Sequence, residues 1–272
     1  MKVAEVIVKI FEREGIDTVY GIPGAGINGV YKYLGQSSIL KHFCHRHEEA
    51  CVHAAGGHFR ASGKLTVAMC ASGPGATNFV TGIYTCNIDS IPVIAVTGQA
   101  VTAQLGKDAF QCVDIAKICA PVAKKTWCVT DPKKVVETFA EAFRVDREGK
   151  PGLVVIDLPF DVRNADIEFD STNYVPLTFD APAPKTTDVV MAIEMIGAAK
   201  NPILLMGGGV LLAINHPLNA GHCGIQVGQP IGNRAFLDSD LVLGIGCRFT
   251  ERGDDGGFWL HVPHSGVGRL RH

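Results

Sequence analysis

The sequence is poor in charge and has no surplus of either sign. Charged residues make up 19% of the 272 positions, and 25 lysines and arginines stand against 27 aspartates and glutamates. An average soluble domain has about 25% charged residues. A protein that binds a nucleic-acid backbone usually needs a positive excess, because it must replace the counterions of the phosphates. The composition therefore argues against a nucleic-acid partner, and the 47% of apolar residues indicates a large core.

Paired cysteines and a targeting segment are also missing. None of the nine cysteines forms a C-x-x-C motif, and their odd number is typical of free thiols in a reducing compartment. The first sixteen residues mix acidic and basic side chains, so they lack the apolar centre of a signal peptide. Residues 65–88 are free of charge, but Ser72-Gly73-Pro74-Gly75 interrupts them. We expect a cytoplasmic protein without a membrane segment.

What the sequence contains is an alternation of helical and β-rich segments. Apolar residues with helical spacing predict a helix from Val3 that ends at Gly15. Strands are predicted at 17–20, 38–42, 65–70, 92–97, 122–129 and 153–158, and a further helix at 132–147. Three of the strands, 65–70, 92–97 and 153–158, are apolar throughout, as in strands covered on both faces. The pattern predicts an α/β fold with a doubly wound parallel sheet.

A change of composition divides the chain. Residues 1–165 carry the alternation, whereas 166–188 have no helical period and include Ala181-Pro182-Ala183-Pro184, as expected of a linker. Beyond it we predict a helix at 189–199 and strands at 203–206 and 241–245. Residues 189–260 are short for an independent α/β domain, so we expect a truncated second domain, and 261–272 an irregular tail.

A glycine motif offers one functional alternative. Gly24-Ala25-Gly26-Ile27-Asn28-Gly29 is a literal G-x-G-x-x-G after a predicted strand, with Glu48 and Glu49 about twenty residues later. This spacing is compatible with an NAD-dependent oxidoreductase. A helix precedes the first strand and Pro23 stands at its exit, so a loop that merely needs close backbone approach explains the glycines equally.

Two other patterns fail on spacing. Five histidines lie between residues 42 and 58, but His47, His53 and His58 do not share one helical face, so a zinc site is not predicted. Ser72 is not the centre of G-x-S-x-G, because position 70 is a cysteine. We therefore assign no metal ligands and no serine nucleophile.

Glu48 is the more informative carboxylate. It follows a predicted strand and starts a predicted helix, which is where open α/β sheets form their ligand sites. A solvated first-turn carboxylate that complements the helix dipole would show the same pattern.

Several motifs in order carry a family resemblance. They are Tyr20-Gly21-Ile22-Pro23-Gly24-Ala25, Arg46-His47-Glu48-Glu49, Ala71-Ser72-Gly73-Pro74-Gly75 with Asn78, Thr97-Gly98-Gln99, Asp108-Ala109-Phe110-Gln111, Pro121-Val122-Ala123-Lys124 and Ile156-Asp157-Leu158-Pro159. Together they resemble the N-terminal, pyrimidine-binding domain of thiamine-diphosphate-dependent carboligases, the group of acetolactate synthase and glyoxylate carboligase. Phe160-Asp161-Val162 looks more like glyoxylate carboligase, whereas Glu48 looks like acetolactate synthase.

The resemblance implies roles for individual residues. Glu48 would be catalytic, hydrogen-bonding the aminopyrimidine ring of thiamine diphosphate so that the cofactor loses its C2 proton. The cofactor-binding set would comprise Pro23, Gly24, Ala25, Glu48, Ser72, Gly73, Pro74 and Asn78. Gln111 and Lys124 would lie at the substrate entrance. The implied reaction joins 2-keto acids with loss of carbon dioxide, and the choice between pyruvate and glyoxylate stays open.

The second domain resembles the family's flavin-binding domain only in pieces. Gly207, Gly208 and Arg248 correspond to FAD contacts, but the helix and strand expected after the glycines are missing, which weighs against a tight FAD site. The family's diphosphate domain holds magnesium through a Gly-Asp-Gly motif and a later asparagine, and no asparagine follows Gly253-Asp254-Asp255-Gly256.

The sequence therefore resembles a fragment or subunit that is inactive alone. It would form a homo- or hetero-oligomer with family chains that carry the diphosphate domain. A non-catalytic dimerisation partner of full-length homologues is the further alternative.

Overall fold

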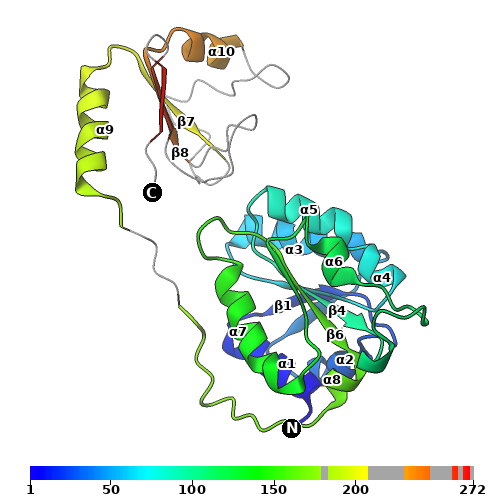
Figure 1. Ribbon diagram of the computed structural model, residues 1–272. Helices are drawn as coiled ribbons and strands as arrows, with labels where there is room; N and C mark the ends of the chain where they lie inside the picture. Colours follow the sequence, from blue (N-terminus) through cyan, green and yellow to red (C-terminus); the bar gives the residue numbers. More distant parts are fainter. Residues whose placement is uncertain (179–182, 208–229, 246–258, 263–265, 270–272) are drawn as a thin grey trace. The chain divides into compact units, whose positions relative to one another are not determined.

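The computed structural model describes residues 1–178, 183–207, 230–245, 259–262 and 266–269 (Figure 1). They belong to two compact units, Met1–Asp180 and Ala181–His272, and each is described by itself.

The N-terminal unit is built on a six-stranded parallel sheet. Its strands are β1 (Thr18–Gly21), β2 (Lys41–Phe43), β3 (Val67–Cys70), β4 (Ile94–Gln99), β5 (Lys125–Cys128) and β6 (Val154–Pro159), in the order β2-β1-β3-β4-β6-β5. All five neighbouring pairs are parallel. Every residue of β3, β4 and β6 is buried, because helices cover both faces of the sheet. The predicted α/β fold class is confirmed.

Helices form a layer on each face (Figure 1). One layer has α1 (Val3–Arg13), α2 (Asn28–Leu34), α7 (Val135–Val145) and α8 (Phe160–Asn164), and it shares a buried cluster with one face of the sheet. The other layer has α3 (Glu48–Ser62), α4 (Pro74–Thr77), α5 (Val80–Ile88) and α6 (Ile115–Cys119). Short 3₁₀ helices, η1 (Thr102–Gln104) and η2 (Pro132–Lys134), precede α6 and α7.

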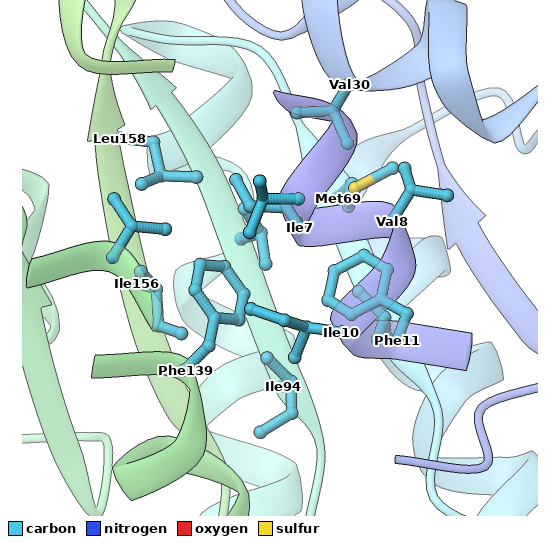
Figure 2. Close-up of a cluster of buried hydrophobic side chains, with 14 of the residues drawn as sticks. Ile7, Val8, Ile10, Phe11, Val30, Met69, Ile94, Phe139, Ile156 and Leu158 are labelled. Carbon is cyan, nitrogen blue, oxygen red and sulfur yellow. The ribbon is translucent and has the colours of Figure 1, made fainter. Parts of the chain in front are cut away.

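The apolar stripe of α1 accounts for the first core cluster. Figure 2 shows Ile7, Ile10 and Phe11 of α1 facing Phe139 of α7 and the strand residue Ile94. The rings of Phe11 and Phe139 meet edge to face with centroids 5.9 Å apart. The helix ends as predicted, because Gly15 has φ +76° directly after the C-cap Glu14.

The N-terminal unit continues into the segment predicted as a linker. Tyr174 is only 6% exposed and belongs to the core cluster against which Ile167 and Phe169 also pack. Its hydroxyl donates to Oε1 of Glu14 at 2.6 Å, and its carbonyl accepts from Arg13 at 3.0 Å. The extended chain after α8 is therefore part of the packed unit up to this point.

The C-terminal unit is a small mixed structure. It contains α9 (Thr186–Ala198), β7 (Pro202–Met206), α10 (Pro230–Leu237), β8 (Leu241–Ile245), β9 (Trp259–Val262) and β10 (Gly266–Arg269), with sheet order β10-β9-β8-β7. Strands β7 and β8 are parallel and the other pairs antiparallel. Residues 261–272, predicted to be an irregular tail, thus contribute residues to β9 and β10. These strands are short and contain glycines, so the sequence pattern did not predict them. None of the described helices has the length and apolar character needed to cross a membrane.

Buried acids in the N-terminal unit give a prediction about pH. Asp146 is fully buried, its Oδ2 has no hydrogen-bond partner among the described residues, and burial raises its pKa to about 8. This folded-state pKa exceeds the ordinary value of 3.8, so the protonated Asp146 carboxyl stabilises the folded state. The contribution is complete below pH 3.8 and is lost as the pH rises through 8. We expect the free energy of unfolding to fall between about pH 5 and 8, and less steeply in Asp146→Asn, as measured by urea denaturation.

The matched control for this prediction is Asp170→Asn. Hydrogen bonds from Thr172 lower the pKa of the exposed Asp170 carboxyl, so it titrates below that pH range and the slope should not change. An unchanged slope in Asp146→Asn would contradict the assignment.

Candidate active site

Glu48 stands at the carboxyl edge of the parallel sheet. The chain leaves β2 at Phe43 and starts α3 at Glu48, and the His47 ring caps this helix by accepting a hydrogen bond from the Glu49 backbone at 3.3 Å. Two carboxylates in the first turn complement the helix dipole. The helix dipole acts on Glu48 and Glu49 alike, so only their hydrogen-bond partners can distinguish the two carboxylates.

The side chain of Asn78 fixes the Glu48 carboxyl. Its Nδ2 donates to Oε2 of Glu48 at 2.9 Å, and Glu48 is partly buried. Gly75 lies beside the other oxygen, since a Cβ built there would be 3.2 Å from Oε1. Within the described residues Asn78 is the hydrogen-bond partner of this carboxyl, which leaves Oε1 available to a ligand.

The turn after β3 lies next to this carboxyl. Gly73 has φ +60° and ψ −122°, a conformation that glycine adopts readily and other residues avoid, and Pro74 begins α4. Gln111 packs on Gly73, where a Cβ would lie 2.7 Å from that of Gln111. The Ser72 hydroxyl donates to Oε1 of Gln111 at 3.3 Å.

The glycine motif after β1 is explained by internal packing. A Cβ at Gly24 would lie 2.7 Å from the Ala71 side chain, and one at Gly26 would lie 2.6 Å from the Ser72 nitrogen. The lack of side chains at these glycines thus allows the loop to pack closely on the turn after β3. The structure favours the packing interpretation of this motif over a dinucleotide site.

The strand order explains which predicted residues come together. Strands β2, β1 and β3 are neighbours, so the segments that leave their carboxyl ends share one edge of the sheet. These segments carry Pro23, Gly24, Ala25, Glu48, Ser72, Gly73, Pro74 and Asn78. Gln111 joins them from the segment after β4.

Lys124, predicted at the substrate entrance, does not lie beside Glu48 in this chain. It precedes β5, so it stands at the amino edge of the same parallel sheet. Its backbone nitrogen donates to Leu153 at 2.8 Å and its Nζ donates to the Glu148 carbonyl at 2.5 Å. Within the N-terminal unit the structure does not bring Lys124 to Glu48.

The remaining predicted residues belong to the C-terminal unit. Gly207 follows β7, and its backbone nitrogen donates to the Ile245 carbonyl oxygen at 2.8 Å. Gly208 and Arg248 lie outside the described residues.

Four buried polar residues to which the sequence analysis assigned no role also stand toward this edge of the sheet. Asp157, at the carboxyl half of β6, accepts from Thr97 at 2.6 Å and from Gln99 at 2.8 Å. Arg163 is fully buried, donates to the Ala25 carbonyl at 3.2 Å and stacks its guanidinium on the Phe160 ring. A carboxylate inside an otherwise apolar strand is a signal that could have identified Asp157, whereas no local pattern marks Arg163.

Two of the five histidines between residues 42 and 58 pair with side chains of the same unit. His53 pairs with Glu49 at 3.2 Å, and the His58 ring accepts or donates at the Tyr20 hydroxyl, 3.1 Å away. Across the parts of the chain that the structure describes, no three His, Cys, Asp or Glu side chains are placed to hold a metal ion.

Comparison with known proteins finds a family that matches part of the N-terminal unit. Residues 1–118 match the family described as thiamine pyrophosphate enzyme, N-terminal TPP binding domain. The matched range contains Gln111 and the predicted residues at the carboxyl edge of β2, β1 and β3. That edge is called here the Glu48 edge and consists of Pro23, Gly24, Ala25, Glu48, Ser72, Gly73, Pro74 and Asn78.

Relatives extend the similarity over most of the chain. It is 37% identical to a glyoxylate carboligase of Escherichia coli O157:H7 over 281 residues, which are 93% of this chain and 47% of the relative. It is also 37% identical to a probable acetolactate synthase large subunit of Methanocaldococcus jannaschii, covering 93% of this chain and 48% of that protein. The acetolactate synthase large subunit of Corynebacterium glutamicum is 36% identical over 92% of the chain and 44% of its own length. The chain thus spans about half the length of these relatives.

Proposed function

We propose that the Glu48 edge binds the aminopyrimidine ring of thiamine diphosphate. The premise is the match of residues 1–118 to the thiamine pyrophosphate enzyme N-terminal TPP binding domain. The Glu48 carboxyl is the observation that carries this proposal. Asn78 holds one of its oxygens at 2.9 Å and the other borders Gly75, which has no side chain to cover it. A flat ring with a basic nitrogen fits such a carboxyl, because the free oxygen can share a proton with the nitrogen.

The chain's own residues would each do one task. Glu48 exchanges a proton with the ring nitrogen, while Asn78 keeps the carboxyl in one orientation. Pro23, Gly24 and Ala25 offer backbone next to the ring, and Gln111 closes the Ser72-Gly73 side. When bound, thiamine diphosphate supplies a carbon nucleophile and an electron sink for the decarboxylation of a 2-keto acid.

The proposed reaction is the joining of two 2-keto acids with loss of carbon dioxide. It rests on relatives whose names are glyoxylate carboligase and acetolactate synthase, so pyruvate and glyoxylate are the substrates to compare. We further propose that the active site is completed by a family chain with a diphosphate-binding part, as a homo- or hetero-oligomer in the cytoplasm.

The family resemblance implies two further cofactors, magnesium and FAD. Magnesium would accompany the diphosphate and would be held by the family chain that carries the diphosphate-binding part. The family resemblance assigns FAD contacts to Gly207, Gly208 and Arg248, but the helix and strand missing after the glycines weigh against tight binding of FAD.

Complementation tests the proposed function. The purified chain is assayed alone and together with a separately produced C-terminal half of a glyoxylate carboligase, with and without thiamine diphosphate. We expect carbon dioxide from glyoxylate or pyruvate only in the mixture and only with the cofactor. The native N-terminal half of the carboligase, paired with the same C-terminal half, is the positive control.

Three results would contradict the proposal. They are activity of the chain alone, an inactive mixture beside an active control, or saturable binding of NAD in place of thiamine diphosphate.

A further inference from the structure

The segment that carries Gln111 has little structure of its own. Residues 105–113, called here the Gln111 segment, contain no helix or strand, and Phe110 is 86% exposed. Its backbone hydrogen bonds are local, such as Lys107 to Gln104 and Cys112 to Ala109. Yet Gln111 adopts a left-handed φ of +52° and packs on Gly73. Something outside the segment has to hold it in this place.

Gln99, the last residue of β4, supplies an anchor. It is only 3% exposed, and its Nε2 donates to the Val113 carbonyl at 2.6 Å and to Oδ2 of Asp157 at 2.8 Å. Its Oε1 accepts from the Ala100 backbone nitrogen at 2.8 Å. Both hydrogens of the amide are therefore used, one toward the sheet and one toward the Gln111 segment.

Asp157 determines which way the Gln99 amide faces. Its carboxyl is 1% exposed and also accepts from the Thr97 hydroxyl at 2.6 Å. A carboxylate can only accept, so the NH₂ end of Gln99 has to point toward it. A reversed amide would place Oε1 against Asp157 and against the Val113 carbonyl, leaving buried acceptors without a donor.

We propose that Gln99 and Asp157 are positioning residues that hold the Gln111 segment over Ser72 and Gly73, beside the Glu48 edge. The value of this arrangement for substrate entry rests on the proposed function. The anchoring itself concerns contacts within this chain and can be tested without cofactor or substrate.

Hydrogen exchange tests the anchoring. Burial raises the pKa of Asp157 to about 7, so the experiment is done at pH 8, where this carboxyl is ionised. The parent chain is compared with Gln99→Met, Asp157→Asn and Thr97→Val. Gln99→Met removes the donor, and Asp157→Asn allows the amide to reverse. Both should speed exchange of the amides at 107–113 by about tenfold or more, whereas those in β1 and β3 keep the rate that global stability sets.

Thr97→Val is the matched control. It removes one hydrogen bond to Asp157 while leaving the link to Val113, so exchange in the Gln111 segment should stay within about twofold of the parent. The proposal is overturned if Gln99→Met leaves the segment unchanged, or if Thr97→Val loosens it as much as Gln99→Met does.

A spectroscopic measurement on the unaltered chain covers the case in which the variants do not fold. The two Nε2 protons of Gln99 should give separate NMR signals that exchange with solvent about 100-fold more slowly than those of the exposed Gln36. Exchange as fast as that of Gln36 would overturn the proposal.

Discussion

Replacing Glu48 by Gln should lower the rate of carbon dioxide release in the complemented assembly by about 100-fold or more. The amide keeps the shape of the side chain and can still accept the hydrogen bond from Asn78. It cannot share an acidic proton with a ring nitrogen, so the loss should fall on the chemical step. Thiamine diphosphate affinity should stay within about tenfold, or about 1.4 kcal/mol, as measured by fluorescence titration.

Glu49→Gln is the control for the Glu48 substitution. Glu49 is the next residue of the same helical turn, about 100° around the axis, and it pairs with His53 at 3.2 Å. Its substitution should leave the rate within about threefold of the parent, because a solvent-exposed pair of this kind contributes little. A large loss of rate in Glu49→Gln with none in Glu48→Gln would contradict the assignment of Glu48 and identify Glu49 as the reactive carboxylate.

Gly98→Ala should destabilise the N-terminal unit by about 3 kcal/mol or more. A Cβ at this position would lie 1.9 Å from the Gly26 carbonyl oxygen and 2.4 Å from its carbon. Backbone atoms cannot rotate away as a side chain can, so either the loop after β1 or the end of β4 has to move. Chemical denaturation should therefore show a lower midpoint.

The same comparison includes Gly57→Ala in α3, where nothing lies within 4 Å of the built Cβ. There alanine should raise the free energy of unfolding by up to about 1 kcal/mol, since it favours the helix. Equal effects of the two substitutions would contradict the close crossing of the loop over β4.

Local patterns predicted the sheet well because its central strands are buried on both faces. The segments predicted at 92–97 and 153–158 are β4 (Ile94–Gln99) and β6 (Val154–Pro159), within two residues at either end. The strand predicted at 241–245 is β8 without a shift. Shorter elements such as α2 and α8 carry too few turns for a periodic signal, so the sequence did not indicate them.

The candidate site was only partly predictable. The start of a helix at Glu48 follows from the local sequence, but its bond to Asn78 depends on β2, β1 and β3 being neighbours. Strand order is a property of the whole fold, which a local pattern does not contain. The left-handed Gln111 was hidden for a related reason, since its conformation depends on packing against Gly73 and on the Gln99 anchor.

The family resemblance assigned roles to Lys124 and Glu48, and the structure places these residues at opposite edges of the sheet. The Lys124 motif matched, yet a residue that directly precedes β5 stands at the amino edge of a parallel sheet. Direction along the strand therefore decides the side of the sheet on which a motif residue lies.

The most direct test of the account measures exchange of the C2 proton of thiamine diphosphate with deuterium, followed by proton NMR in the complemented assembly. The account predicts rapid exchange with the parent chain and with Glu49→Gln, and exchange slower by about 100-fold or more with Glu48→Gln. Exchange at the same rate in the parent and in Glu48→Gln, with the cofactor bound to both, would contradict the assignment of Glu48.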